Sequence, residues 1–344
     1  MKKVVILGGG FAGAKIAKSL EKYFEVTLVD SKDYYEFTPG VLRSIVKPYH
    51  LSKIQVLHSH YLKKAKVLVE CVKEINSNYV KTEKNRLVFD YLIICLGSSY
   101  NTPFKEKEVV VTTRGAHLRN YSKQLQKAEK IVIIGGGIVG VELAAEIKEF
   151  YKDKKITIIH KNDKLMERNH LKTISHSKKF LKNKNVDIIY NEKASVYDKK
   201  TITTNKGTKI KADLFFICTG ITPNSDSLKK NLGSSLNDNN QIKVNDYLQM
   251  ENYNNIFAAG DITNINEEKL AQNAEKQARI VIKNIKNINS QKPLVKYSSK
   301  PRIMVISLGR WNGVLQYKSL IISGIIPGIL KTLIEWKTMI KYRF

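Results

Sequence analysis

Short runs of apolar residues that end in glycine recur along this chain. Residues 4–7 and 131–134 are each fully apolar, and each leads into three consecutive glycines. A run this short and without polar alternation predicts a strand buried on both faces. The residues behind the glycines favour a helix, over 12–20 in one case and over 139–150 in the other. The sequence therefore contains the order strand, glycine turn, helix twice.

Both glycine turns match the G-x-G-x-x-G fingerprint of dinucleotide-binding folds, at residues 8–13 and 135–140. In this fingerprint the glycines allow a tight turn and a close backbone approach, and the N-terminus of the helix holds a pyrophosphate. Asp30 ends the next apolar strand, 22 residues beyond Gly8, where an acidic residue receives a ribose hydroxyl. These parts predict two dinucleotide sites arranged for moving hydride.

A second repeated pattern indicates an internal duplication. Residues 91–97 and 214–220 are both apolar strands closed by glycine. A further apolar run ends on Gly260-Asp261. We expect an α/β fold with two Rossmann-like domains and a small C-terminal region. The expected boundaries are 1–110 with 222–290 for a discontinuous first domain, 111–221 for an inserted second domain, and 291–344 for the C-terminal region.

Charge and cysteine content narrow the partners and the chemistry. The net charge of +28 predicts attraction to an anionic surface, and no nucleic-acid fold signature accompanies the basic residues. The three cysteines form no CxxC, which argues against a metal site and against a sequence-local redox disulfide. We expect Cys95 and Cys218 to be buried small apolar residues, in a reducing compartment.

The N-terminus and the tail bear on localisation. Residues 4–7 are too few for a signal peptide, and Lys2 after Met1 excludes N-myristoylation. Residues 319–334 are mostly apolar but too short and too broken by Pro327-Gly328 to span a bilayer. Beyond Gly328 an apolar face and an opposite polar face predict an interfacial helix, with a core-packing helix as the alternative. We expect a cytoplasmic protein, peripheral on the inner face of the membrane.

Taken in order, these motifs resemble the two-dinucleotide-binding flavoprotein oxidoreductases. Within that group, residues 307–313 and 336–339 look like the NAD(P)H:quinone oxidoreductases of the ferroptosis-suppressor, or AIF-like mitochondrion-associated inducer of death, type. Type II NADH dehydrogenases are further relatives. The resemblance covers the whole chain and implies a glutathione-reductase-like two-domain flavoprotein.

The resemblance implies FAD in the first site and NADH or NADPH in the second. Arg43 would contact FAD, with a solvated surface arginine as the alternative, and Asp30 would bind the adenosine ribose. Asp261 would touch the ribityl chain of the flavin, a role compatible with capping a helix. The remaining cofactor-binding candidates are Gly8, Gly9, Gly10, Phe11, Ala12, Gly13 and Gly97 with Gly260 for FAD, and Gly135, Gly137, Ile138, Val139, Gly140, His160 and Gly220 for the nicotinamide nucleotide.

Three catalytic candidates also come from the resemblance. Glu142 matches a glutamate near the nicotinamide, Lys331 a lysine near the flavin, and Gln272 a segment that lines the quinone. For each, a polar residue on a solvated helix face is the alternative. His160-Lys161 stands where an acid would repel a 2′-phosphate, so we expect NADPH to be accepted comparably with NADH.

The resulting hypothesis is an FAD-dependent NAD(P)H:quinone oxidoreductase that passes hydride to FAD and electrons to a membrane quinone. It docks on an anionic membrane through its basic tail and binds no nucleic acid. One alternative is a soluble flavoprotein reductase of a small carrier protein such as rubredoxin or ferredoxin. The other is a redox-responsive binding flavoprotein with slow turnover.

Overall fold

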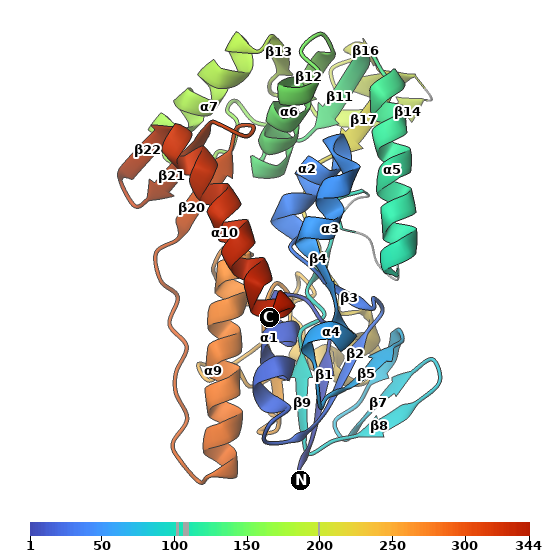
Figure 1. Cartoon of the computed structure of the whole chain (residues 1–344), viewed down its shortest axis with the longest axis vertical. Helices are drawn as coiled ribbons and strands as arrows, with labels where there is room; N and C mark the ends of the chain where they lie inside the picture. The colour runs from blue at the N-terminus through green and yellow to red at the C-terminus, as the bar shows by residue number, and fades with distance from the viewer. Residues whose placement is uncertain (101–102, 106–109, 199) are drawn as a thin grey trace.

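The computed structural model describes residues 1–100, 103–105, 110–198 and 200–344. Two sheet-centred units lie along the long axis of the molecule (Figure 1). The first occupies the lower half, and the second, with green and yellow elements, occupies the upper half. We propose for the folded chain the division expected from its sequence, and refer to the first, second and C-terminal units in that sense.

The first unit is built on a five-stranded parallel sheet. Val4 and Ile6 of its central strand are fully buried, as the unbroken apolar run predicted. The strand order is β19 (Ile256–Ala258), β9 (Tyr91–Ile94), β1 (Lys3–Leu7), β2 (Glu25–Asp30) and β5 (Lys66–Val69). Helices α1 (Phe11–Leu20) and α9 (Ala271–Asn289) pack against each other beside this sheet (Figure 1).

The second unit repeats this plan with four parallel strands. Its order is β13 (Val186–Ile189), β12 (Lys155–Ile159), β11 (Lys130–Ile134) and β17 (Leu214–Ile217). Strand β11 lies between β12 and β17 as β1 lies between β2 and β9. Helix α6 (Ile138–Phe150) follows the second glycine turn as α1 follows the first. The duplication in the sequence is thus a duplication of structure.

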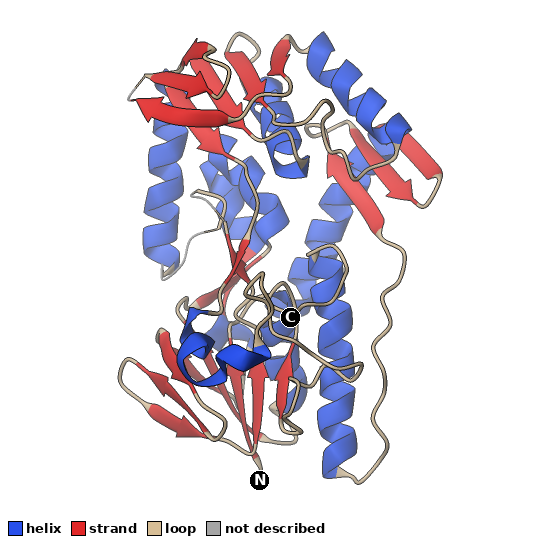
Figure 2. Ribbon diagram, turned by 180° about the vertical axis from the view of Figure 1, so that it is seen from behind, coloured by secondary structure: helices blue, strands red, loops and turns tan. Residues whose placement is uncertain are grey.

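Two short strands join the units. The chain leaves the first unit at β10 (Ser98–Ser99) and returns at β18 (Thr222–Pro223), and the two strands pair antiparallel. They run through the middle of the molecule in Figure 2. The smaller sheets are β3 (Tyr34–Glu36) with β4 (Gln55–Leu57), β6 (Val72–Ile75) with β7 (Tyr79–Thr82) and β8 (Arg86–Val88), and β14 (Ala194–Asp198) with β15 (Thr201–Thr204) and β16 (Lys209–Lys211).

The remaining helices lie between the units or on their surfaces. Helix α2 packs against both α6 and α5, so it bridges the two halves (Figure 1). The helices are α2 (Val41–Val46), α3 (Leu51–Ile54), α4 (His58–Tyr61), α5 (Val111–Lys127), α7 (Leu171–Asn183) and α8 (Lys229–Leu232), with 3-10 turns at Thr38–Gly40, Pro48–His50, Asp226–Leu228 and Gly233–Ser235.

An extended segment, the tether (residues 290–302), leads from α9 to the C-terminal unit. It runs back along α9 without regular structure, and most of its residues are exposed (Figure 1). Tyr297 donates a hydrogen bond to Glu267, and Arg302 forms an ion pair with Glu268. The C-terminal unit then forms β20 (Ile303–Ser307), β21 (Gly313–Tyr317), β22 (Leu320–Gly324) and α10 (Ile325–Arg343).

Helix α10 runs from the second unit to the first, where its end lies near α1 (Figure 1). It begins at Ile325, three residues before the start expected from Gly328, because Pro327 lies in the first turn, where a proline is tolerated. In the described part of the chain, no helix combines the length and the apolarity that crossing a bilayer requires.

Much of the apolar face of α10 is exposed, although Leu330 and Ile340, which the sequence also placed on that face, are half-buried. Its exposed members are Ile325 (62%), Ile326 (71%), Ile329 (41%), Leu333 (52%) and Trp336 (64%). The polar face, with Lys331 and Glu335, is turned toward the interior instead. A helix that packed by its apolar face would show the reverse.

Candidate functional site

The two glycine turns have the same backbone geometry. Gly8 has φ of 92° and Gly135 has φ of 111°, a region that favours glycine. A Cβ on Gly8 would strike the carbonyl oxygen of Cys95, and one on Gly135 would strike that of Cys218. Each turn therefore requires glycine because a neighbouring strand of its own sheet lies against it.

The helix N-termini behind these turns are open. Gly10 caps α1 and Gly137 caps α6, neither with a side-chain hydrogen bond. A Cβ built on either would find nothing within 4 Å. Uncapped N–H groups beside open space fit a pyrophosphate. Phe11, Ala12 and Gly13 in the first unit, and Ile138, Val139 and Gly140 in the second, form the first turns of these helices.

One position differs between the two units. In the first, the Gly9 N–H donates to Oδ2 of Asp30 at 2.7 Å. In the second, the Gly136 N–H donates to Nδ1 of His160 at 3.1 Å. The Nε2 of His160 lies 3.0 Å from the Lys164 carbonyl oxygen, so the ring accepts at one nitrogen and donates at the other. Both side chains follow the second strand of their unit and contact the second glycine of its turn.

Asp30 remains ionised although it is buried. Burial alone raises its pKa, but the hydrogen bond from His58 and the charge of Lys32 outweigh this, so that the pKa is lowered. The Nε2 of His58 is 3.3 Å from Oδ2 of Asp30, and its Nδ1 is 2.6 Å from the Tyr61 hydroxyl. Sequence reasoning missed His58 because no motif marks it.

Three further glycines have positive φ, and each follows the end of a strand. They are Gly97 (62°), Gly220 (67°) and Gly260 (91°). Asp261 follows the last of them and accepts a hydrogen bond from Ser98 Oγ at 2.6 Å. The residue after Gly97 and the residue after Gly260 thus meet at the carboxyl edge of the first sheet. Ligands of such sheets bind outside this edge.

Two further side chains lie at Asp261 and the glycine turn before it. The Lys105 ammonium lies 3.5 Å from the Asp261 carboxylate, and burial lowers the pKa of this lysine despite that partner. Gln277, almost fully buried, accepts a hydrogen bond from the Gly260 N–H at 2.6 Å and fixes the turn.

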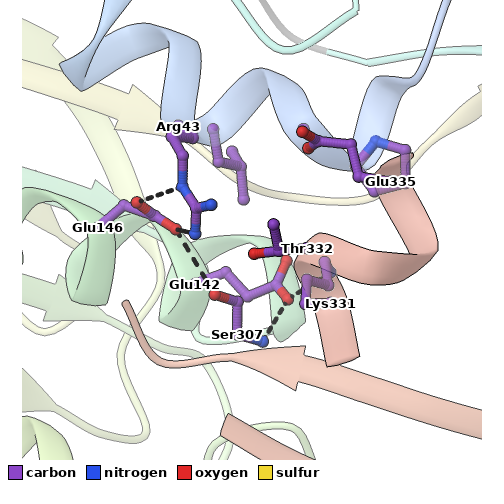
Figure 3. A pocket seen from close by; sticks show the side chains of 10 residues that line it. Arg43, Glu142, Glu146, Ser307, Lys331, Thr332 and Glu335 are labelled. Carbon is purple, nitrogen blue, oxygen red and sulfur yellow. Dashed lines mark hydrogen bonds and ion pairs between the residues drawn. The ribbon is translucent and has the colours of Figure 1, made fainter. Parts of the chain in front are cut away.

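A polar pocket lies where the first, second and C-terminal units meet (Figure 3). Its polar lining comes from α2, α6, β20 and α10. The residues are Arg43, Glu142, Glu146, Ser307, Lys331, Thr332 and Glu335.

Glu142 and Lys331, two of the three predicted catalytic residues, are in direct contact. The Lys331 Nζ donates to Oε1 of Glu142 at 2.8 Å, and the Ser307 N–H donates to the same oxygen at 2.8 Å (Figure 3). Glu142 is only 5% exposed. The alternative of a surface carboxylate is wrong for Glu142, because that side chain is buried. Lys331 does lie on the polar face of α10, and that face is turned to the pocket.

Arg43 forms a second pair across the same pocket. Its guanidinium donates two hydrogen bonds to Glu146, at 2.8 and 3.3 Å, the bidentate geometry of a strong pair (Figure 3). The alternative of a solvated arginine is therefore wrong. Sequence reasoning missed Glu146, although it lies one helical turn beyond Glu142 on the same face of α6.

A third ion pair, between His50 and Glu335, reaches the same pocket through Glu335. His50 Nε2 lies 3.1 Å from Oε2 of Glu335, with both side chains largely buried. Each of the three pairs joins a different two of the three units: first with second, second with C-terminal, and C-terminal with first. Sequence reasoning missed His50 and Glu335 as site residues.

Gln272, the third catalytic candidate, does not join the pocket. Its amide donates to the Ile303 carbonyl oxygen at 2.7 Å and so ties α9 to the first strand of the C-terminal unit. The structure thus brings together Glu142, Lys331 and Arg43 but not this glutamine.

Cys95 and Cys218 are buried and unbridged, as predicted. Burial raises the pKa of the Cys95 thiol to about 12 and that of Cys218 further still. Such thiols are not nucleophiles near neutral pH. Neither lines the polar pocket.

Comparison with known proteins identifies relatives over the whole chain. The sequence profile of the pyridine nucleotide-disulphide oxidoreductase family matches residues 2–278. Apoptosis-inducing factor homolog B of Dictyostelium discoideum is 35% identical over 92% of this chain and 89% of its own length. Ferroptosis suppressor protein 1 of Mus musculus is 32% identical over 98% of this chain and 95% of its own. These relatives confirm the resemblance inferred from the motifs.

Solved structures confirm the fold. NDH2 from Plasmodium falciparum in complex with NADH superposes with a TM-score of 0.83 at 18% identity, covering 100% of this chain and 96% of its own. The sulfide:quinone oxidoreductase from Aquifex aeolicus gives 0.84 at 19% identity, covering 100% and 92%.

Proposed function

Because this chain belongs to the pyridine nucleotide-disulphide oxidoreductase family, we propose that it is an FAD-dependent NAD(P)H:quinone oxidoreductase. The observation that carries the proposal is the pocket in which Glu142 and Lys331 meet at 2.8 Å. It lies between two dinucleotide-binding units and beside a helix with an exposed apolar face. We infer that both nucleotides and an apolar acceptor reach this pocket.

The residues of the two turns fit the two nucleotides. In this proposal the N–H groups behind Gly10 hold the FAD pyrophosphate and Asp30 its ribose, while the N–H groups behind Gly137 hold NAD(P)H. Bound FAD supplies the redox chemistry between a hydride donor and the acceptor. The two units would hold the nicotinamide of NAD(P)H next to the flavin of FAD.

Lys331 is the residue that we propose to contact the quinone. Glu142 fixes its Nζ at the pocket, and an ammonium there donates a hydrogen bond to a carbonyl oxygen that gains charge on reduction. The buried, unpaired cysteines do not supply a thiol route for the electrons. The related sulfide:quinone oxidoreductase is named for a quinone acceptor.

We also propose that the exposed apolar face of α10 docks on an anionic membrane. Leu320 (55% exposed) and Ile322 (38%) of the preceding strand β22 are exposed as well. The net charge of +28 favours anionic lipid over neutral lipid. A lipid-soluble quinone would then enter the pocket from the side of α10. Docking on the inner face of the membrane is part of this proposal.

The test begins with the purified protein. It should absorb as a flavoprotein and bleach when NADH is added without oxygen. Glu142→Gln and Lys331→Gln should each lower turnover with ubiquinone-1 by about 100-fold, the effect typical of losing one positioned polar group. Lys337→Gln, an equal charge change on the exposed side of α10, should leave turnover within twofold. A colourless protein that takes up no added FAD contradicts the proposal.

A further inference from the structure

Quinone reduction needs a proton that the nicotinamide does not bring. A quinone becomes a quinol by taking up two electrons and two protons, whereas NAD(P)H delivers a hydride, which is two electrons and one proton. The balanced reaction is NAD(P)H + H⁺ + quinone → NAD(P)⁺ + quinol. If the proposed function is right, the protein has to pass one proton from water to a quinone oxygen at the pocket.

The three ion pairs around the pocket differ in their ability to do this. The guanidinium of Arg43 does not release a proton in proteins. The ordinary pKa of a lysine ammonium lies well above neutral pH. Imidazole is the side chain that gains and loses a proton between pH 5 and 8. His50 is therefore the member of these pairs whose chemistry suits repeated proton delivery.

The geometry links His50 to the pocket through Glu335. The Nε2 of His50 lies 3.1 Å from Oε2 of Glu335, and Glu335 lines the pocket. Glu335 and Lys331 leave the same helix one turn apart (Figure 3). Gly40 makes room for the carboxylate, since a Cβ there would lie 2.8 Å from Oε2 of Glu335.

The other charged residues of the pocket have their own hydrogen-bond partners and do not take the place of His50 beside Glu335. Arg43 lies close enough to Glu335 to interact with it electrostatically, but both of its hydrogen bonds in the pocket go to Glu146. Lys331 is bound to Glu142. Among the described charged residues of the pocket, Glu335 is thus the carboxylate held by an imidazole.

We propose that His50 and Glu335 deliver the proton for quinone reduction. The Nε2–H bond of imidazolium His50 breaks as the proton passes to Oε2 of Glu335. The O–H bond of protonated Glu335 then breaks as the proton passes to the quinone oxygen, which the electrons have made basic. His50, whose side chain is 9% exposed, regains a proton from water. In this relay Glu335 contacts the substrate and His50 acts through it.

The experiment compares two acceptors, because ferricyanide takes electrons without protons. His50→Gln keeps a hydrogen-bond donor to Glu335 but cannot carry a proton. We expect the ratio of ubiquinone-1 turnover to ferricyanide turnover to fall about 100-fold in His50→Gln and in Glu335→Gln. Added imidazole should restore ubiquinone-1 turnover to His50→Ala.

The pH profile gives a second readout. A proton donor has to be protonated, so wild-type ubiquinone-1 turnover should fall as the pH rises through the ionisation of the relay, while ferricyanide turnover should not. This alkaline limb should disappear in His50→Gln. A purely structural pair predicts the opposite: His50→Gln retains the hydrogen bond and the turnover ratio, or both acceptors lose turnover equally. Either of these results overturns the relay.

The experiments can reject the proposed function independently of the proton relay. If the wild-type protein oxidises NADH with ferricyanide but not with any quinone, the acceptor is wrong, whatever the variants do. If wild type reduces quinone and the turnover ratio of the variants is unchanged, the quinone function stands and the relay is rejected.

Discussion

At the scale of single residues, the most informative position is the one occupied by Asp30 in the first unit and His160 in the second. Both accept a hydrogen bond from the second residue of a glycine turn, yet one is an anion and the other an imidazole that accepts through Nδ1. The sequence alone located both residues. It did not reveal that the His160 ring folds back on Gly136, because the direction of a side chain depends on its neighbours in space.

The difference in charge leads to a prediction about the nucleotide. His160→Asp should lower kcat/KM for NADPH by about tenfold or more relative to NADH, because a carboxylate there repels a 2′-phosphate. Steady-state kinetics with both donors measure the ratio. Lys161→Gln, a change at the exposed neighbouring residue, should lower kcat/KM for NADPH but not for NADH. An unchanged ratio in His160→Asp, or a wild-type preference for NADH above roughly a hundredfold, would contradict this.

At the scale of elements, helix α10 shows what a pattern of residues settles and what it leaves open. The periodicity gave two faces correctly, but the polar face lies inward because it finds charged partners on other elements. Its far end is buried as well: Tyr342 packs on Tyr35 with ring centroids 4.3 Å apart and on Tyr61 at 4.9 Å. The helix is thus anchored by its polar face and its end, and the apolar residues between remain exposed.

This arrangement makes point substitution a sharper test of membrane docking than deletion, since deletion also removes Lys331 and Tyr342. Ile326→Ser with Trp336→Ser should abolish co-sedimentation with vesicles containing anionic phosphatidylglycerol, because the docking face loses its two most exposed large apolar side chains. Turnover with water-soluble ubiquinone-1 should stay within twofold. Val88→Ser with Leu171→Ser, exposed apolar residues elsewhere, is the control. Unchanged binding would exclude α10 as the docking face.

At the scale of the whole molecule, the fold was easier to predict than the pocket. The strands and glycine turns are local in sequence, so their order predicted two nucleotide-binding units. The three ion pairs of the pocket join residues 103, 189 and 285 positions apart, and no local pattern pairs such charges. Glu142 and Lys331 were identified by family resemblance. Glu146, His50 and Glu335 had no such signal and became visible only when the three units met.

The exposed tether between α9 and β20 has a consequence of its own. The C-terminal unit is held by side-chain contacts to both other units, so the covalent link is not what keeps it in place. Cutting a protease site inserted between Ser298 and Ser299, both exposed, should leave two fragments that co-elute on size exclusion and keep most of their quinone turnover. Separation of the fragments would show that the contacts are too weak. If the contacts are strong enough, residues 1–298 and 299–344 produced as separate polypeptides should bind each other and form an active reductase. The activity would then report that the two polypeptides have bound.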